Sequence, residues 1–164
     1  MSIQLRTATK EDIDILAKIH SRSLNEAFGE IYKKHFSYED RYSGFTHELN
    51  LGKPNNLLVL YNDEPIGLLT YGGSRYVEID DDSIELWRIY LEPDFWGRGF
   101  GTQTLEKALE IIKSLGYKKV ILWVLEKNIR ARRFFDKNGF IDSGKQLKDQ
   151  IGQEIIDLMY VKEI

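Results

Sequence analysis

Cysteine is absent from this chain of 164 residues, and proline occurs only three times. Without cysteine there are no disulfides, thiolate metal sites, iron–sulfur clusters or cysteine nucleophiles, and a reducing compartment such as the cytoplasm fits this composition. The longest apolar runs fall far short of the ~20 residues that a membrane-spanning helix needs. The N-terminal residues show no basic segment followed by an apolar stretch, so we expect no signal peptide.

Neither sign of charge is in large excess, because 23 basic and 26 acidic residues leave a net charge of only -3. This balance gives no reason to expect nucleic acid as a partner. A content of 42% hydrophobic and 30% charged residues is typical of a globular chain, and this length suffices to bury one core. We therefore expect a single cytoplasmic domain over residues 1–164 with no membrane or nucleic-acid partner, and the sequence leaves open whether two copies form a homodimer.

Strand patterns and helix patterns alternate along the chain. Thr9 with Asp12 three residues later is typical of a capping box that starts a helix. The expected strands cover residues 2–8, 57–61, 66–71, 84–91, 120–125, 140–143 and 154–162, and the expected helices cover 10–28, 38–50, 102–116 and 128–139. The predicted class is α+β, with a strand–helix–strand crossover between residues 84 and 125.

Glycine is concentrated in one stretch, PDFWGRGFGT at residues 93–102, where Gly97, Gly99 and Gly101 are each separated by one residue. Glycine loses more conformational freedom on folding than any other residue, so such a run needs a reason. The run lies between a predicted strand and a predicted helix, where free N–H groups and the helix dipole attract phosphate. A strand-to-helix turn without a ligand is the alternative, but one glycine suffices for that turn, so we favour a phosphate site.

Two common phosphate motifs fit this run poorly. A Walker loop requires lysine directly after its last glycine, whereas Thr102 and Gln103 follow Gly101. A dinucleotide-binding motif requires G-x-G-x-x-G, whereas the spacing here is G-x-G-x-G, and the nearest suitable acidic residue, Glu126, comes later than expected. A dinucleotide-binding enzyme therefore remains only as a weak alternative.

From Ile84 onward the chain resembles the GNAT family of N-acetyltransferases. The family signature Arg/Gln-x-x-Gly-x-Gly/Ala matches residues 96–101, except that Trp96 occupies its first position. The spacing Asn-x-x-Ala-x-x-Phe-Phe-x-x-x-Gly-Phe at residues 128–140 is also similar to the family pattern. The resemblance implies a GNAT fold, which is a single mixed, mostly antiparallel sheet of about seven strands flanked by helices. It further implies an acetyl-CoA-binding core at residues 84–141 and a variable, substrate-side part at residues 1–83.

The resemblance also assigns roles to individual residues. It implies that acetyl-CoA binds, as acyl donor, to Tyr90, Leu91, Trp96, Gly97, Arg98, Gly99, Phe100, Gly101, Thr102, Asn128 and Phe135. Within this set, the N–H of Leu91 is the implied donor to the thioester oxygen, and Asn128 is also a preferred helix N-cap. Glu85, a carboxylate in an otherwise apolar strand, aligns with the general base of several members. Its alternative is a structural carboxylate that is solvated or paired with Arg88.

Two positions depart from the family pattern. The usual arginine or glutamine side chain is missing where Trp96 stands. Phe135 stands where the family commonly has a tyrosine that protonates the leaving thiolate, and a phenyl ring cannot donate a proton. Because the chain has no cysteine, direct transfer in a ternary complex is favoured over a covalent acyl-enzyme.

The expected function is acetyl-CoA-dependent N-acetylation of a primary amine. A small molecule such as a polyamine, an amino acid or an amine-bearing antibiotic is favoured, because the acidic stretch at residues 78–82 would attract a cationic substrate. Two alternatives remain open. The protein could acetylate protein N-termini or lysines, or it could bind CoA or acyl-CoA without turnover, as Phe135 suggests. Aromatic residues of the first two helices, such as Phe28 and Tyr32, either line a substrate pocket or belong to the core.

Overall fold

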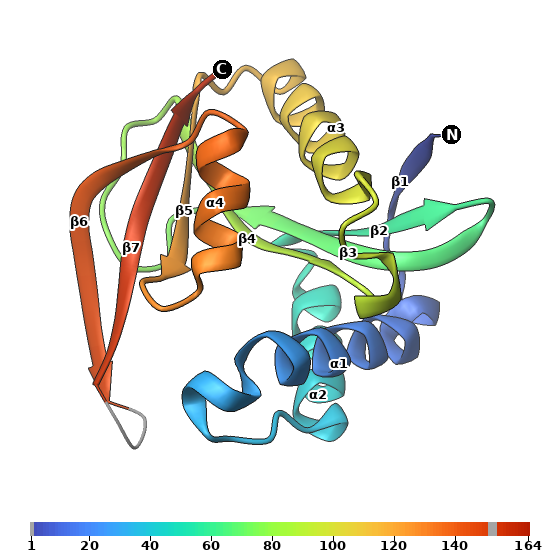
Figure 1. Ribbon diagram of the computed structural model, residues 1–164. Coiled ribbons are helices and arrows are strands. Elements are labelled where there is room, and N and C mark those ends of the chain that lie inside the picture. The colour runs from blue at the N-terminus through green and yellow to red at the C-terminus, as the bar shows by residue number, and fades with distance from the viewer. Residues whose placement is uncertain (1, 151–153) are drawn as a thin grey trace.

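A seven-stranded mixed sheet runs through the computed structural model, which describes residues 2–150 and 154–164 (Figure 1). Its strands are β1 Ile3–Thr7, β2 Asn55–Tyr61, β3 Glu64–Gly72, β4 Ser83–Leu91, β5 Lys119–Leu125, β6 Ile141–Gln150 and β7 Glu154–Glu163. The strand order is β1-β2-β3-β4-β5-β7-β6, and only β4 and β5 pair in parallel. The α+β class, the mostly antiparallel sheet and the parallel crossover are thus confirmed.

Four α-helices among the described residues cover the two faces of this sheet. They are α1 Ile13–Tyr32, α2 Tyr38–Leu51, α3 Phe100–Ser114 and α4 Ile129–Lys137. Figure 1 shows α1 and α2 together on one side of β3 and β4, with α3 and α4 on the other. None of the helices among the described residues is long and apolar enough to cross a membrane.

Each face has its own apolar core, as the alternation of side chains along a strand requires. On the first face, Leu58 of β2 and Leu68 of β3 pack with Leu16 of α1 and Phe45 of α2. On the second face a larger cluster joins α3 and α4 to β3, β4, β5 and β7; it includes Leu69, Leu86, Leu105, Ile112, Leu122, Phe135 and Tyr160. The side of the sheet to which a residue of β4 or β5 points therefore decides which pair of helices it meets.

Local signals place most of the element boundaries. The predicted capping box is present, because the Thr9 N–H donates to the Asp12 carboxylate over 2.7 Å. Helix α2 starts where Ser37 Oγ accepts from the Asp40 N–H, and it continues through Gly44 without a break. Strand β6 extends to Gln150, whereas the sequence predicted a strand only over 140–143. The prediction was too short because this edge strand is exposed and lacks the apolar alternation that identifies a strand.

Strands β4 and β5 pair for only three residues and then separate. The last pair joins Glu85 to Ile121, although β4 continues to Leu91. Directly after this pair β4 contains a bulge. Tyr71 of β3 lies opposite Leu86 and Thr70 lies opposite Arg88, so Trp87 between them has no partner in β3. A bulge increases local twist and bends its strand. The far ends of β4 and β5 thus diverge, and the helices that follow them, α3 and α4, both begin at this opening (Figure 1).

The close approach of β3 to the end of β4 gives a stability prediction. A Cβ atom on Gly67 would lie 2.5 Å from both the Tyr90 carbonyl oxygen and Leu91 Cδ2. We expect Gly67→Ala to lower the free energy of unfolding by about 2 kcal/mol or more, because backbone has to move. Urea denaturation measures this loss.

The matched control is Gly44→Ala at an exposed position of α2, where an added Cβ meets nothing within 4 Å. It should be neutral or stabilise the protein by up to about 1 kcal/mol, as alanine does in a helix interior. Equal effects of the two substitutions would contradict the packing of Gly67 against β4.

Candidate active site

The three glycines of the run serve different structural needs. Gly97 and Gly99 have φ values of 72° and 82°, which favour glycine, and Gly99 is the N-cap of α3. An added Cβ would meet nothing within 4 Å at either position, so the space around them is open. At Gly101 a Cβ would lie 3.2 Å from Phe134, so this glycine lets α3 and α4 approach closely. Backbone conformation and packing thus explain the glycines, and the phosphate site stays a prediction that the open space supports.

Trp96 connects the glycine run to both sides of the opening. Its indole Nε1 donates to the Leu91 carbonyl over 2.9 Å, and the Arg130 guanidinium of α4 lies 3.6 Å from the ring centroid. Burial lowers the pKa of Arg130 from its ordinary value. The guanidinium of Arg98 lies 5.1 Å from the rings of both Phe95 and Phe100. One arginine within the run and one from α4 thus lie close to it, although Trp96 at the first signature position is uncharged.

The backbone of β4 presents N–H groups to the opening. The Glu92 N–H donates to the Ile66 carbonyl of β3 over 2.7 Å. In an antiparallel ladder, hydrogen-bonded pairs alternate with non-hydrogen-bonded pairs. Because Glu92 is hydrogen-bonded to Ile66, the next pair, Leu91 with Gly67, is not hydrogen-bonded. The pair two residues further on, Ile89 with Leu69, is not hydrogen-bonded either. The N–H groups of Leu91 and Ile89 consequently point away from β3, towards the side that β5 has left. The sequence had indicated only Leu91; spacing by two along the strand would have indicated Ile89 as well.

Phe135 and Asn128 lie on the α3–α4 side of the opening. Phe135 is buried among aromatic rings, with centroids 5.2 Å from Phe134 and 5.6 Å from Phe140. Asn128 Oδ1 accepts from the Ala131 N–H over 3.2 Å, which confirms its capping role. Asn128 is thus held at the start of α4 by its capping hydrogen bond, and Phe135 is held by ring packing nearer the end of this helix. The family resemblance assigns both residues to the cofactor site.

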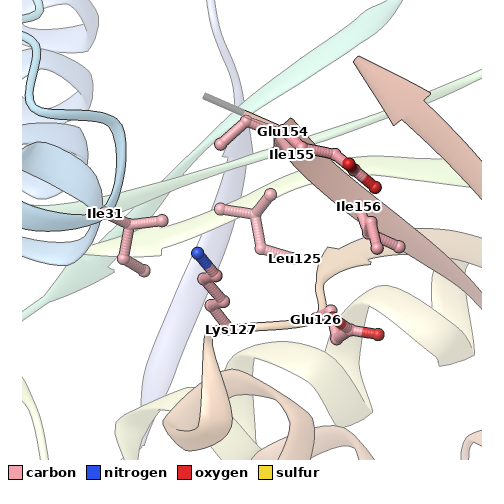
Figure 2. A pocket seen from close by; sticks show the side chains of 7 residues that line it. All are labelled: Ile31, Leu125, Glu126, Lys127, Glu154, Ile155 and Ile156. Atoms are coloured by element: carbon pink, nitrogen blue, oxygen red, sulfur yellow. The ribbon is translucent and has the colours of Figure 1, made fainter. Parts of the chain in front are cut away.

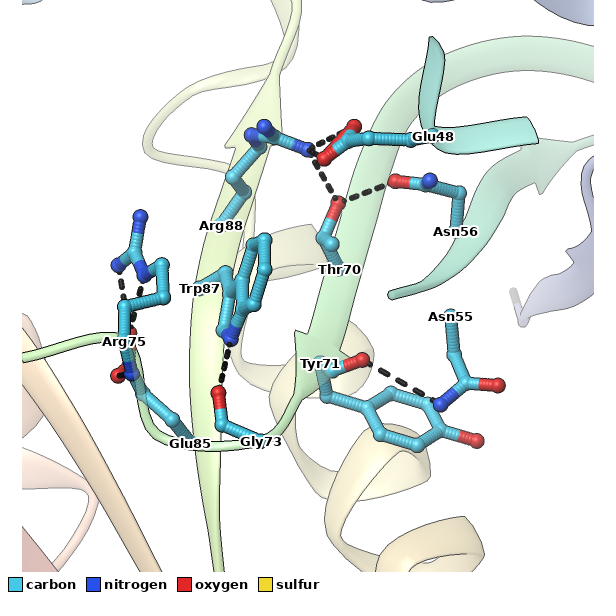
Figure 3. Close-up of polar contacts among 10 residues, drawn as sticks. All are labelled: Glu48, Asn55, Asn56, Thr70, Tyr71, Gly73, Arg75, Glu85, Trp87 and Arg88. Carbon is cyan, nitrogen blue, oxygen red and sulfur yellow. Dashed lines mark hydrogen bonds and ion pairs between the residues drawn. The ribbon is translucent and has the colours of Figure 1, made fainter. Parts of the chain in front are cut away.

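Glu85 is fully buried, and its carboxylate is held by Arg75 of the β3–β4 loop (Figure 3). Arg75 Nε donates to Glu85 Oε2 over 2.7 Å and the Arg75 backbone N–H donates to Oε1 over 3.0 Å. The suggested pairing of Glu85 with Arg88 is therefore absent: Arg88 instead contacts the Glu48 carboxylate of α2 over 2.9 Å. The role of Glu85 as general base stays a prediction, and its partner had no signal in the sequence.

Aromatic rings line the α1 side of the opening. The Tyr90 ring, which follows Ile89 on β4, lies 5.2 Å from His20 and 6.4 Å from Phe28, so its side chain points to α1 and away from α3. Contacts between Phe28, Tyr32 and Phe36 extend this row towards the end of α1. Burial raises the pKa of Tyr90 to about 12, so the phenol stays protonated near neutral pH. Burial also lowers the pKa of His20 well below its usual value, helped by nearby arginines, so His20 is neutral there.

A pocket of about 240 Å³ lies where the end of α1, the end of β5 and the start of β7 meet (Figure 2). Its lining residues are Ile31, Leu125, Glu126, Lys127, Glu154, Ile155 and Ile156. Figure 2 shows the Lys127 ammonium group directed between Ile31 and Leu125. The sequence did not indicate this pocket, because three segments far apart in the chain build it.

The acidic stretch lies far from Leu91 and the glycine run. Asp80 and Asp82 line a second hollow together with Lys113, Lys118 and Lys119, at the start of β4. Ser83 and Leu91 are the two ends of β4, which at 3.3 Å per residue lie roughly 26 Å apart. The carboxylates next to Ser83 are thus remote from Leu91 and surrounded by lysines, which weakens the argument that they attract the substrate.

Comparison with known proteins agrees with this geometry. The model of the Acetyltransferase (GNAT) family matches residues 19–140. The chain therefore belongs to the GNAT family of acetyltransferases. Its sheet opens between two parallel strands, and a glycine-rich helix start lies at this opening. The family resemblance and the fold that it implied are confirmed.

Individual relatives cover the chain to different extents. An uncharacterized N-acetyltransferase of Methanocaldococcus jannaschii is 28% identical over 137 residues, and these cover 83% of this chain but only 59% of that protein. Spermidine N(1)-acetyltransferase of Thermoplasma acidophilum is 26% identical over 163 residues, which cover 95% of this chain and 96% of that protein. The crystal structure of PaiA N-acetyltransferase from Thermoplasma acidophilum in complex with coenzyme A superposes with a TM-score of 0.73 at 23% identity, covering 100% of both chains. This last likeness supports the fold.

The conformation of the glycine run gives a second prediction. We expect Gly99→Val to weaken acetyl-CoA binding at least tenfold, because the side chain enters the open space over the first N–H groups of α3. The substitution also destabilises the protein, since valine at a φ of 82° is strained by about 1–2 kcal/mol. Isothermal titration calorimetry measures the affinity, and thermal unfolding measures the strain.

Gly116→Val is the matched control, because Gly116 has a φ of 97°, also has open space, and lies beyond the other end of α3. It should cause similar destabilisation and leave acetyl-CoA affinity unchanged. Unchanged affinity in both variants would overturn the phosphate site at the glycine run.

Proposed function

We propose that the protein is an acetyl-CoA-dependent N-acetyltransferase that acts on a primary amine of a small molecule. The observation that carries this proposal is the opening between β4 and β5, which presents the N–H groups of Leu91 and Ile89 beside the start of α3. Family membership supports the reaction class. The structure in complex with coenzyme A supports acetyl-CoA as the donor.

The residues around the opening suit transfer of an acetyl group to an amine. A phosphate-bearing donor bound at the glycine run would direct its acyl end into the opening, where the N–H groups of Leu91 or Ile89 would stabilise the developing oxyanion. The amine must lose a proton before it attacks, and we assign this proton to the buried Glu85 carboxylate, directly or through water. Transfer is then direct, in a ternary complex, because the chain offers no cysteine for an acyl-enzyme.

Polyamines are the first acceptors to test. One relative that covers almost the whole chain is named spermidine N(1)-acetyltransferase. The α1 side of the opening adds aromatic rings, which attract cationic amines. The acidic stretch at residues 78–82 gives little support, because lysines surround Asp80 and Asp82.

A screen of amines for acetyl-CoA consumption tests the proposal. We expect thiol release with spermidine or another small primary amine, and acetyl-CoA should raise the melting temperature whereas NAD should not. Turnover only with peptide N-termini or lysines would replace small molecules by proteins as the acceptors. Stabilisation by CoA without turnover of any amine would instead favour a CoA-binding module.

The buried position of Phe135 gives a further prediction. Phe135→Tyr should leave kcat within about threefold of the wild type, because we expect water or another residue to protonate the thiolate. Phe140→Tyr, in the same aromatic cluster, is the control for adding a hydroxyl group. A gain of about tenfold with Phe135→Tyr alone, which is ~1.4 kcal/mol in the barrier, would show that the missing hydroxyl limits the reaction.

A further inference from the structure

Arg75 occupies a site that is built for a cation. Its guanidinium lies 4.9 Å from the Tyr76 ring centroid and 4.7 Å from the Trp87 ring centroid. Arg75 Nη2 lies 2.6 Å from Glu85 Oε2, which also accepts from Arg75 Nε. A cation that contacts two aromatic rings and pairs with a buried carboxylate is held well, whether it is an ammonium or a guanidinium group.

Each wall of this site has a contact that does not involve the Arg75 side chain. Trp87 is the residue of the β4 bulge without a partner in β3, and its indole Nε1 donates to the Gly73 carbonyl over 2.9 Å (Figure 3). The Tyr76 ring contacts the Trp123 ring of β5 over 6.1 Å. Glu85 belongs to the last pair between β4 and β5. If the Arg75 side chain withdrew, a carboxylate and two rings would therefore remain in place at the base of the opening.

Arg75 also controls access to the carboxylate. The Glu85 side chain is 0% exposed, whereas the Arg75 side chain that covers it is 26% exposed. Solvent thus reaches this site at Arg75, which belongs to the loop between β3 and β4. A cation from solution would reach Glu85 by taking the place of the Arg75 guanidinium.

We propose that Glu85, Trp87 and Tyr76 form the binding site for the cationic amine of the acceptor, and that Arg75 is an internal competitor that occupies this site in the absence of acceptor. This inference rests on the proposed function, because it identifies the ligand of this site as the acceptor. The acceptor ammonium displaces the guanidinium, hands one N–H proton to the Glu85 carboxylate and retains a lone pair for attack. The acceptor class is then a primary amine that is positively charged in solution.

The proposal predicts a gain of affinity when Arg75 is removed. A site that is free in only a tenth of the molecules weakens the apparent affinity about tenfold, so Arg75→Ala should lower the KM for spermidine by about that factor. The KM for acetyl-CoA should not change. Arg75→Gln, which keeps the length of the side chain without its charge, should act in the same direction and serves if the alanine variant does not fold.

Direct binding provides a readout that does not depend on turnover. n-Propylguanidinium, which reproduces the end of an arginine side chain, should bind to Arg75→Ala in isothermal titration calorimetry and raise its melting temperature. It should bind at least tenfold more weakly to the wild type and to the double variant Arg75→Ala/Glu85→Gln. Arg6→Ala is the matched control, since it removes another arginine that forms two hydrogen bonds to one carboxylate, Asp12, and it should change neither affinity nor KM.

Two results would overturn the proposal. One is a spermidine KM that is unchanged or raised in both Arg75 variants, and the other is equal binding of n-propylguanidinium to the variants with and without Glu85. If the wild type acetylates no amine at all, the proposed function fails, but the binding measurements still decide whether Arg75 occupies a cation site.

Discussion

The separation of β4 from β5 is the constraint on which the rest of the structure depends. A parallel pair that continued past Glu85 and Ile121 would consume the N–H groups of Ile89 and Leu91 in the sheet. The bulge at Trp87 prevents this, and the exposed backbone is then stabilised from outside the sheet. The Leu91 carbonyl accepts from the Ser23 hydroxyl of α1 over 3.0 Å and from the Trp96 indole. Residues from both sides of the sheet thus hold the end of β4 in position.

The glycine run shows how one short segment satisfies several physical demands together. Positive φ values at Gly97 and Gly99 turn the chain from β4 into α3, and the missing side chain of Gly101 brings α3 against Phe134 of α4. The same glycines leave the first turn of α3 uncovered. Turn, packing and access are therefore not competing explanations of this segment, because a single backbone path provides all three.

Much of this architecture could be predicted from the sequence, because its signals are local. Apolar periodicity marks α3, and a nearly unbroken apolar run marks β5. The capping box at Thr9 marks the start of the first helical turn. The family signature places the start of α3 next to the end of β4. Strand β6 was underestimated, because an exposed edge strand has no buried face to impose a pattern on its residues.

The partners of the site residues could not be predicted from the sequence. Arg75 and Arg88 are both arginines close to Glu85 in the chain, and only the path of the β3–β4 loop decides that Arg75 forms the ion pair. The remoteness of Asp80 from Leu91 likewise follows from the direction in which β4 runs. Pairings between side chains in three dimensions depend on the fold, whereas motif spacing reports only the order of residues along the backbone.

Trp96 stands out once its surroundings are known. Its ring touches a cation from α4, its indole N–H binds the last carbonyl of β4, and the glycine run begins at the next residue. The fluorescence of an indole changes when the polarity of its surroundings or the groups in contact with it change. A position that departs from the family pattern thus provides the protein with a built-in optical reporter, whose fluorescence responds to whatever enters the space between the two helix starts.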